Sequence, residues 1–465
     1  MNRTYIKDLL EKEEEEVEVF GWVNSRRDHG KIIFFDLRDS TGLLQVVSTP
    51  KNDDSYKIAT SLSSEDVVRV KGQLKSRPEA NFNEDLPTGK IELNATELET
   101  IGKAKELPLP IDTDGSEIDE MVRLRYRYLD LRRERLQNNL RIRHQTGSLV
   151  REFLNNKNFI EVETPYLSKT TPEGARDFLV PSRLQKGKFY ALAQSPQQYK
   201  QLLMVSGVDR YYQFPRAFRD EDLRSDRQFE HTQIDMELAF VEREDVLALI
   251  EEMMLEIAEK FGKKVTEKKF PRFSYAEAMK KFGADKFDIR KNKEDKNELA
   301  FTFVIDFPLF EYVEEEKRWT FSHNPFTAPK LEDLRDLQSA KNIDKIGSLQ
   351  YDLVCNGFEL ASGSIRIHEP EIQKQVFKIM GYSESEIKKD FGHILEAYEF
   401  GAPIHGGVAL GFDRLVAVLS GEKSIREVIA FPVNASGQTS VMEAPSQVLA
   451  GTLKELGLKQ LSNNE

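Results

Sequence analysis

Residues 216–235, RAFRDEDLRSDRQFEHTQID, bring basic and acidic side chains together in one short segment. Four arginines are interspersed with six carboxylates. Arginine guanidinium groups form paired hydrogen bonds with phosphate oxygens, and carboxylates bind hard metal ions such as Mg²⁺. The segment therefore indicates a loop that binds a polyanion together with its metal ions. A solvent-exposed hairpin with alternating charges is the alternative interpretation.

Three further segments contain residues suited to the same site. TPEGARDF contributes Glu173, QSPQQYKQLL contributes Gln197 and Lys200, and GVALGFDR ends in Arg414. The glycines before Arg414 would let the backbone approach a ligand closely. The chain has no P-loop segment and no convincing GxGxxG segment, which argues against a P-loop or a dinucleotide-binding fold. Phosphates are therefore expected to be held by arginine forks and metal ions.

The overall composition limits the class of protein. The chain has 465 residues and a net charge of −12, which predicts two or three domains and argues against a general binder of nucleic acids or membranes. Its single cysteine, Cys355, excludes an intramolecular disulfide and a CxxC zinc site. The N-terminal residues lack the apolar core of a signal peptide, and no apolar run approaches the roughly 20 residues of a membrane span. We expect a cytoplasmic protein without a membrane partner.

Residues 1–105 are expected to form a small β-barrel. Five short strand patterns are separated by turn residues, and a helical pattern at residues 56–63 lies within the series. This arrangement is typical of an OB-fold. Phe34 and Phe35 are neighbours on one strand and must face opposite sides, so one belongs to the core and the other is available to stack on a base. Arg26, Arg27 and Gln45 are expected to be exposed beside it.

An arginine-rich segment follows the barrel. Residues 106–122 are expected to form a linker or hinge, because prolines, aspartates and a glycine punctuate its start. Eight arginines then fall between Arg123 and Arg143. They indicate either contacts with a phosphate backbone or a solvated helix face with paired acids, and the sequence does not separate these alternatives.

Residues 123–445 mix strand and helix patterns without a βαβ rhythm. The patterns predict a helix over 133–155, a strand over NFIEVETPYL (158–167), strands within 301–310 and 351–368, and late helices at 414–420 and 447–456. We therefore expect an α+β domain built on an antiparallel sheet with flanking helices. Residues 446–465 are expected to form a C-terminal helix and tail.

The segments NFIEVETPYL, FRDEDLRSDRQFEHTQID and GVALGFDR occur in the order of the three class II motifs. Together with TPEGARD, QSPQQYKQLL, SHNPFT and FELASGSIRIH, they make nearly the whole chain resemble the aspartyl-tRNA synthetases, class II aminoacyl-tRNA synthetases, in their bacterial type. The resemblance implies that aspartate attacks the α-phosphate of ATP, and that the aspartyl group then passes to a terminal hydroxyl of tRNA(Asp). It also implies Mg²⁺ as cofactor and a homodimer formed through NFIEVETPYL.

The resemblance also assigns an ATP site. Arg219 would hold the α-phosphate and Arg414 the γ-phosphate, and both would be catalytic together with Glu359. Asp352 and Glu359 would hold Mg²⁺, a hard cation suited to carboxylates. The residues implied to bind ATP are Arg219, Asp220, Glu221, Gln228, His231, Glu359, Gly411, Phe412, Asp413 and Arg414.

An aspartate pocket and an anticodon face follow from the same resemblance. Arg366, through a bidentate fork, and Lys200 would bind the side-chain carboxylate of the substrate, although an isolated basic residue more often forms a structural ion pair. His323 would close over the ligand. The residues implied to bind aspartate are Glu173, Ser195, Gln197, Lys200, Arg219, Asp235, His323 and Arg366. Those implied to bind the anticodon are Arg26, Arg27, His29, Phe34, Gln45 and Glu92.

The chain departs from the family's pattern at several places. His231 replaces a phenylalanine that stacks on adenine, ELASGS replaces a more glycine-rich run, and Val433 replaces a lysine. Only 176 positions separate Asp235 from Gly411 (411 − 235 = 176). The large inserted domain of bacterial members is therefore expected to be missing, with a short remnant near residues 285–300.

Other functions remain as alternatives. A sibling enzyme for asparagine or lysine is disfavoured by Arg366 and Lys200, because an amide does not reward two cations and a lysine side chain would be repelled. A paralogue that does not charge tRNA is disfavoured by the barrel. His29 lies in the loop SRRDHGK, where this family contacts the anticodon, and a histidine there is typical of members that charge tRNA(Asn) as well as tRNA(Asp).

Overall fold

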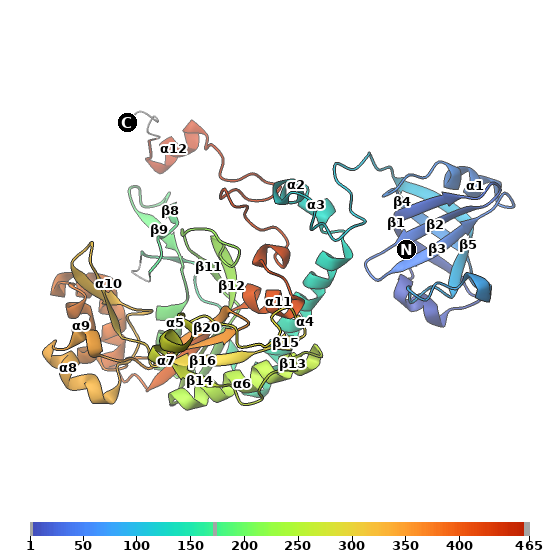
Figure 1. Ribbon diagram of the computed structural model, residues 1–465. Helices are drawn as coiled ribbons and strands as arrows, with labels where there is room; N and C mark the ends of the chain where they lie inside the picture. Colours follow the sequence, from blue (N-terminus) through green and yellow to red (C-terminus); the bar gives the residue numbers. More distant parts are fainter. Residues whose placement is uncertain (1–2, 171–173, 460–465) are drawn as a thin grey trace. The chain divides into compact units, whose positions relative to one another are not determined.

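The computed structural model describes residues 3–170 and 174–459, so the predicted site residue Glu173 lies outside the described residues. The chain divides into two compact units, residues 1–110 and residues 111–465 (Figure 1). Within the described ranges, no helix is long and apolar enough to cross a membrane.

The first unit is a closed barrel of five strands in the order β1-β2-β3-β5-β4. Inward-facing side chains alternate with partly exposed ones along its strands, and Val19, Phe35 and Leu93 are completely buried. A short helix, α1, lies between β3 and β4 in the chain. The predicted OB-fold is therefore confirmed. Its elements are β1 (Glu16–Asp28), β2 (Ile33–Arg38), β3 (Leu43–Ser48), α1 (Asp53–Thr60), β4 (Val67–Ser76) and β5 (Ile91–Gly102).

The second unit is built on one large sheet, in which β11 pairs with β12 beside the main path. In order, its strands are β14 (Arg272–Ser274), β16 (Phe301–Ile305), β19 (Gln350–Cys355), β20 (Phe358–Ile365), β21 (His405–Gly411), β12 (Glu230–Ala239), β10 (Arg210–Gln213) and β6 (Ile160–Glu161), with β11 (Arg216–Phe218) at the side. The pairs from β16 to β10 are antiparallel, as predicted. The outermost pairs, β14–β16 and β10–β6, are parallel instead. Each of them is joined through a helix, which is the connection that parallel neighbours require.

Helices cover this sheet and complete two hydrophobic cores. Side chains of α4, α6 and α11 pack with the sheet in the larger core, and α8, α9 and α10 contribute to the second. The helices of this unit are α2 (Glu120–Arg125), α3 (Arg127–Asp130), α4 (Glu134–Asn156), α5 (Gln197–Val205), α6 (Arg243–Lys260), α7 (Tyr275–Phe282), α8 (Leu334–Ser339), α9 (Pro370–Ile379), α10 (Glu384–Glu399), α11 (Phe412–Ser420) and α12 (Ala450–Leu456). The smaller sheets pair β13 (Lys264–Val265) with β15 (Glu298–Leu299), β17 (Phe310–Val313) with β18 (Arg318–Phe321), and β9 (Phe189–Leu192) with both β7 (Leu167–Ser168) and β8 (Leu179–Pro181).

The strand expected over NFIEVETPYL is much shorter than predicted. Within this segment, Ile160–Glu161 forms strand β6 at the edge of the large sheet, and Leu167 begins β7, which belongs to a separate small sheet. Val162 still donates its backbone N–H to the carbonyl of Tyr212. Pro165, which has no N–H to donate, then prevents the chain from continuing as an inner strand.

The arginine-rich segment is neither a phosphate-binding surface nor a solvated face at its centre. Arg123, Arg127 and Arg133 are all buried around the carboxylate of Asp130, with N–O distances of 3.1, 2.8 and 2.6 Å. Arg123 also binds Glu427 at 2.6 Å. These arginines join α2 and α3 to the C-terminal part of the unit, so both alternatives for them were wrong.

Candidate active site

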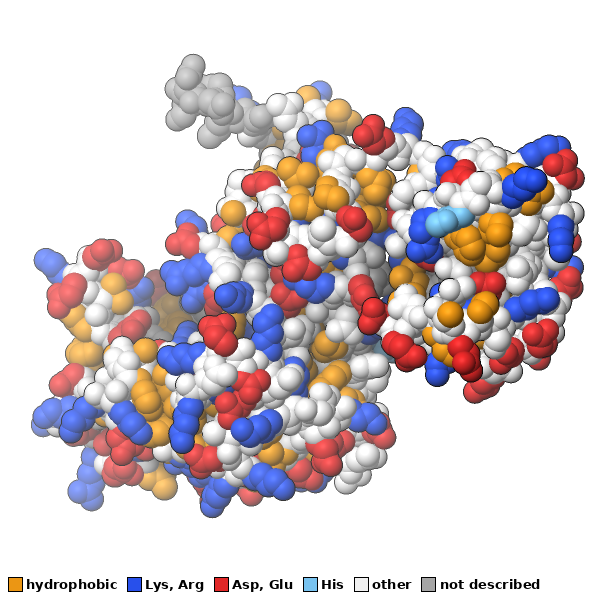
Figure 2. Space-filling view, turned by 45° about the vertical axis from the view of Figure 1, so that its right-hand side comes forward, with side chains coloured by type: hydrophobic (Ala, Val, Ile, Leu, Met, Phe, Trp, Pro, Cys, Tyr) orange, Lys and Arg blue, Asp and Glu red, His pale blue; other side chains and the backbone are white. Residues whose placement is uncertain are grey.

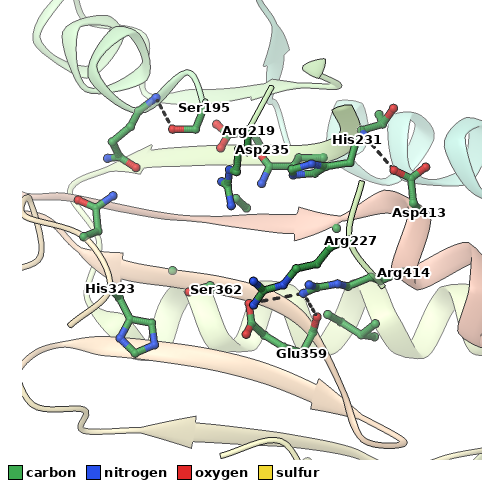
Figure 3. Close-up of a pocket in the computed structure, with 18 of the residues that line it drawn as sticks. Ser195, Arg219, Arg227, His231, Asp235, His323, Glu359, Ser362, Asp413 and Arg414 are labelled. Atoms are coloured by element: carbon green, nitrogen blue, oxygen red, sulfur yellow. Dashed lines mark hydrogen bonds and ion pairs between the residues drawn. The ribbon is translucent and has the colours of Figure 1, made fainter. Parts of the chain in front are cut away.

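A cavity of about 290 Å³ opens above the middle of the large sheet (Figure 3). Residues from β12, β20 and β21 line it together with α5, the start of α11 and the segment between β11 and β12. The opening segment RAFRDEDLRSDRQFEHTQID thus folds across the cavity. One end of the cavity carries a cluster of buried charges, and the other end carries arginines.

The buried cluster contains two cations and two carboxylates. The Nζ atom of Lys200 on α5 lies 2.8 Å from Asp235 Oδ2 and 3.2 Å from Glu237 Oε2. Arg366, which follows β20, donates to both oxygens of Glu237 at 2.9 and 3.2 Å. All four side chains are at most 3% exposed. Their formal charges cancel, so the cluster can be buried without leaving an isolated charge.

The bidentate fork of Arg366 therefore engages Glu237 in this structure, and the expectation that Arg366 binds a substrate carboxylate stays a prediction. Arg366 also donates to Ser364 Oγ and to the Gly407 carbonyl, at 2.6 and 3.3 Å. Since a guanidinium has five N–H groups, one N–H on Nη1 is left for a ligand. Lys200 likewise has one N–H beyond its two carboxylate partners. The two cations can each offer one charged donor to the cavity.

Glu237 was missed by the sequence prediction. It lies two residues beyond Asp235 on β12, so both side chains point to the same face of the sheet. Burial opposes its ionisation, but Arg366 and Lys200 hold the pKa of Glu237 down at about 2. The period of two along β12 was the signal that could have found it.

Gly407, the first glycine of GVALGFDR, is needed for the packing of this charged cluster. A Cβ atom at Gly407 would collide with the Glu237 carboxylate and with the carbonyl of Met236. Glycine at position 407 therefore makes room for the charged pair behind the cavity.

Asp235, one of the cavity-lining residues, carries a buried acceptor. Its Oδ1 atom is buried and makes no hydrogen bond with the residues that the structure describes. Complete burial raises the pKa of Asp235 against the pull of Lys200. Because an unpaired buried acceptor is costly, this oxygen fits a cationic donor such as a substrate ammonium.

Arg227 and Arg414 line the cavity beside Glu359, while Arg219 lies next to Asp235 (Figure 3). Arg414 Nη1 donates to the Glu359 carbonyl at 2.9 Å, and its Nη2 lies 3.2 Å from Asp226 Oδ2. Arg227 lies 3.6 Å from Glu221. These partners hold Arg227 and Arg414 in place, and their guanidinium groups give this part of the cavity a surface suited to phosphates. Arg227 was not predicted as a site residue.

Asp352 and Glu359, the predicted metal ligands, lie on the hairpin formed by β19 and β20. Glu359 lines the cavity, while Asp352 lies behind its wall and accepts from Gln350 Nε2 at 3.0 Å. Burial and the nearby Glu359 raise the pKa of Asp352 to about 8. A pair of carboxylates beside arginines fits Mg²⁺, which binds one or two carboxylates together with substrate phosphates. The described residues contain no group of three or more His, Cys, Asp or Glu side chains that could hold a metal ion by themselves.

Two histidines line the cavity in their neutral form. Burial, together with Arg219 and Arg414, lowers the pKa of His231 to about 3. Burial also lowers the pKa of His323, whose Nε2 lies 3.7 Å from Asp352 Oδ2. His231 lies beside Arg219 and Asp235, and His323 lies across the cavity from them (Figure 3).

The structure does not bring every predicted residue to the cavity. Phe412 is buried in the large core, where its ring contacts Phe214 edge to face at 5.4 Å. Asp413 lines the cavity, but its carboxylate accepts from Thr232 N and Arg143 Nη1. The motif position of Phe412 thus has a packing role and that of Asp413 a hydrogen-bonding role.

Asp220 and Gln228 also have partners outside the predicted ATP site. Asp220 is not among the cavity-lining residues, and its backbone N–H bonds to the Arg176 carbonyl. Gln228 lines the cavity and is 2% exposed, and its side-chain oxygen accepts from Val433 N at 2.7 Å. That contact uses the backbone of Val433, and nothing in the structure explains the valine side chain. The remaining predicted ligands that line the cavity are Ser195, Gln197, Lys200, Arg219, Glu221, His231, Asp235, His323, Glu359, Arg366, Gly411 and Arg414.

Arg27, Phe34, Gln45 and Glu92 lie on one face of the barrel, while Arg26 pairs across the strands with the buried Phe35 and points to the other side. Arg27 Nη2 donates to Asp36 and to Gln45, and Gln45 Nε2 donates to Glu92 at 3.0 Å. Phe35 is buried in the core and Phe34 is partly exposed, in agreement with the prediction that one of these two rings is core and the other is accessible. Figure 2 shows apolar, basic and histidine side chains gathered on one face of this unit. Such a face is typical of single-stranded nucleic-acid binding by OB-folds.

Comparison with known proteins identifies the family. Residues 119–435 match the family of tRNA synthetases class II (D, K and N), and residues 17–101 match an OB-fold nucleic acid binding domain. The chain belongs to the class II tRNA synthetases. This synthetase is 39% identical to the aspartate--tRNA(Asp/Asn) ligase of Dehalococcoides mccartyi strain CBDB1 over 97% of each chain. It is 41% identical to the ligase of the same name from Thermodesulfovibrio yellowstonii, over 96% of this chain and 98% of that one.

The synthetase lacks residues that its relatives have. The alignment with the Dehalococcoides ligase spans 585 positions, so at least 120 of them have no counterpart here (585 − 465 = 120). That these positions form one inserted domain stays a prediction. Its predicted place, near residues 285–300, holds only the two-residue strand β15 at Glu298–Leu299, and residues 283–297 form no helix or strand.

Solved structures confirm the fold. A putative aspartyl-tRNA synthetase from Leishmania major Friedlin superposes with a TM-score of 0.76 and 20% identity, over 94% of each chain. Asparaginyl-tRNA synthetase from Pyrococcus horikoshii, complexed with asparaginyl-adenylate, superposes with a TM-score of 0.73 and 23% identity, over 92% of this chain and 97% of that one.

Proposed function

We propose that this synthetase activates L-aspartate with ATP and transfers it to tRNA(Asp). The observation that carries the proposal is the juxtaposition in one cavity of two buried cations, Lys200 and Arg366, with an arginine-lined end suited to phosphates. The names of the relatives that are about 40% identical support the same choice of amino acid. Asparagine and lysine lack the side-chain carboxylate that would accept hydrogen bonds from the remaining N–H groups of Lys200 and Arg366.

The residues of this chain act by positioning and charge stabilisation. An oxygen of the aspartate α-carboxylate attacks the α-phosphate of ATP, and the bond to the pyrophosphate oxygen breaks. Arg219 would stabilise the charge that develops on the α-phosphate, and Arg414 would bind the departing pyrophosphate. When bound by Asp352 and Glu359, Mg²⁺ would neutralise phosphate charge.

The substrate is held by groups on both sides of its α-carbon. Lys200 and Arg366 would each donate one N–H to the side-chain carboxylate, and Oδ1 of Asp235 would accept from the ammonium. His231 would contact the adenine. In the second step, a terminal hydroxyl of tRNA attacks the carbonyl carbon of the adenylate, and AMP leaves.

The proposed partners follow from two surfaces. Ile160 on the edge strand β6 and nearby Leu167 are 57% and 51% exposed, and an exposed apolar edge strand is a natural place for a second copy of the chain. A homodimer is therefore proposed, which light scattering would test. The face around Phe34 and Gln45 is proposed to bind the anticodon, and the enzyme would work in the cytoplasm, where tRNA is charged.

The decisive experiment is pyrophosphate exchange into ATP with one amino acid at a time. Aspartate should support exchange, while asparagine and lysine should not. Equal exchange with asparagine, or exchange with none of the three, would refute the proposed substrate. Adding tRNA(Asp) and labelled aspartate then tests the second step.

A second candidate activity is the charging of tRNA(Asn) with aspartate. The observation that favours it is His29 on the proposed anticodon face, where its ring contacts Phe34 at 5.6 Å. Relatives named aspartate--tRNA(Asp/Asn) ligase support it. An amidotransferase in the same cell would then have to convert the product.

A further inference from the structure

Lys286 brings a basic side chain to the predicted metal ligand from outside the motifs. It lies in residues 283–297, between α7 and β15. Its Nζ atom is 2.7 Å from Oε2 of Glu359, while Oε1 of Glu359 lies 3.7 Å from Arg414. The carboxylate thus has a different cation on each oxygen. Lys286 and Arg414 together hold the pKa of Glu359 below its usual range, although burial opposes this.

The backbone next to Lys286 is fixed in place. Phe287 is 7% exposed and stacks on Phe282, with ring centroids 3.9 Å apart. Its carbonyl accepts a hydrogen bond of 3.2 Å from the N–H of Gly357, in the turn between β19 and β20. The same hairpin carries Asp352 and Glu359. Lys286 is therefore anchored to the hairpin of the predicted metal ligands and is not a free surface lysine.

The ion pair cannot persist unchanged when ATP and its metal ion are bound. A metal ion on Glu359 would compete with the Lys286 ammonium for the same carboxylate. The lysine side chain is 39% exposed and ends a flexible four-carbon stem, so the ammonium can move while the backbone stays fixed. The phosphates next to Arg414 are the nearest new anions that the proposed function supplies.

We propose that Lys286 is a phosphate-binding residue of this synthetase, paired with Glu359 in the free enzyme and with the β- and γ-phosphates of ATP in the complex. The proposal rests on the proposed function for the identity of the phosphate ligand. Lys286 would keep Glu359 in place before ATP binds, and it would then stabilise the pyrophosphate that leaves.

The test compares Lys286→Met with Lys291→Met, an exposed lysine of the same segment. Mn²⁺ binding to the ATP-free enzyme, measured by electron paramagnetic resonance, should become about tenfold tighter in Lys286→Met, because a competing cation is removed. In pyrophosphate exchange, the KM for pyrophosphate should rise about tenfold or more, with the KM for aspartate unchanged. Lys291→Met should match the wild type in both measurements, and Lys286→Arg should recover most of the pyrophosphate affinity.

Each outcome decides the proposal. An unchanged KM for pyrophosphate in Lys286→Met would overturn it, and so would equal effects of both methionine variants. Circular dichroism melting shows whether each variant is folded. If Lys286→Met is misfolded, Lys286→Gln replaces it in the comparison with Lys291→Met. If the wild type showed no aspartate-dependent exchange, the proposed function would fail, while equilibrium binding of pyrophosphate with Mg²⁺ would still test Lys286.

Discussion

Glu237 on β12 accepts two hydrogen bonds from Arg366, at 2.9 and 3.2 Å, and neither side chain is more than 3% exposed. The glutamate also lies 3.2 Å from Lys200. It thereby fixes both cations that are proposed to recognise the substrate side chain. Glu237 does not line the cavity, so it is a positioning residue and would not touch the substrate.

Glu237→Gln should destabilise the protein strongly. Breaking a buried pair leaves the cations uncompensated and costs about 3–5 kcal/mol of unfolding free energy. Urea denaturation would measure the loss. Glu252→Gln is the matched control, because Glu252 pairs with Lys157 on the surface, where both side chains are at least 36% exposed and a loss of at most about 1 kcal/mol is expected. Equal effects of the two substitutions would contradict the assigned role.

The same carboxylate should make stability depend on pH. The pKa of Glu237 is about 2 in the folded protein and near its ordinary value of 4.5 in the unfolded chain. Since the folded pKa is depressed, the stabilisation is complete above pH 4.5 and declines as the pH falls towards 2. Urea midpoints between pH 5 and 3 should therefore fall more steeply in the wild type than in Glu237→Gln. Parallel slopes would show that Glu237 is not ionised in the folded state.

Arg366→Leu should abolish most aspartate activation. It removes both a charged donor to the substrate and the partner of Glu237, at a cost of about 3–5 kcal/mol, or roughly 150- to 5,000-fold in the specificity constant for aspartate. The double variant Arg366→Leu with Glu237→Gln should regain stability without regaining activity, since the unpaired carboxylate is gone but the donor is still missing. Pyrophosphate exchange and urea denaturation separate these effects. Activity restored in the double variant would assign Arg366 a purely structural role.

His231→Phe should strengthen ATP binding. The imidazole is neutral above its pKa of about 3, so the substitution changes ring area without changing charge at neutral pH. A larger ring on adenine is expected to lower the KM for ATP about two- to tenfold. The dependence of activity on pH between 6 and 8 should be the same in both proteins. A higher KM in the variant would mean that a ring nitrogen of His231 accepts or donates a hydrogen bond to ATP.

The sequence predicted those features that depend on neighbouring residues. The alternation around Phe34 and Phe35 predicted which ring is buried, and the charges within residues 216–235 pointed to a segment that does line the cavity. The motifs located most of the cavity lining, from Lys200 to Arg414.

Features that depend on distant partners could not be predicted in this way. Arg123 is buried because Glu427, 304 positions later, meets it. The fork of Arg366 is occupied because Glu237, 129 positions earlier, lies opposite it. Phe412 belongs to a motif, yet the start of α11 turns its ring into the core. Charge and motif membership identify residues that could bind a substrate. The fold decides whether such a residue contacts the substrate or pairs with another side chain of the protein.

His29→Leu should restrict which tRNA is charged. An imidazole can hydrogen-bond to more than one base edge, whereas a leucine cannot and penalises a base that fits poorly. The His29 ring lies edge to face against Phe34 at 5.6 Å, which places it beside a ring available for base stacking. Aspartate and asparagine anticodons differ only at their last position, so a single contact can separate them.

The measurement is aminoacylation of purified tRNA(Asn) and tRNA(Asp) with labelled aspartate. The wild type should charge both, and His29→Leu should lose tRNA(Asn) charging by about tenfold or more while keeping tRNA(Asp) charging, since a lost recognition contact in the anticodon is worth about 1–3 kcal/mol. His144→Leu, an exposed position on α4, should behave as the wild type. Pyrophosphate exchange without tRNA should be equal in all three proteins, because neither His29 nor His144 lines the cavity that is proposed to form the adenylate. If the wild type charges tRNA(Asn) no better than an unrelated tRNA, the relaxed specificity assigned to His29 is wrong.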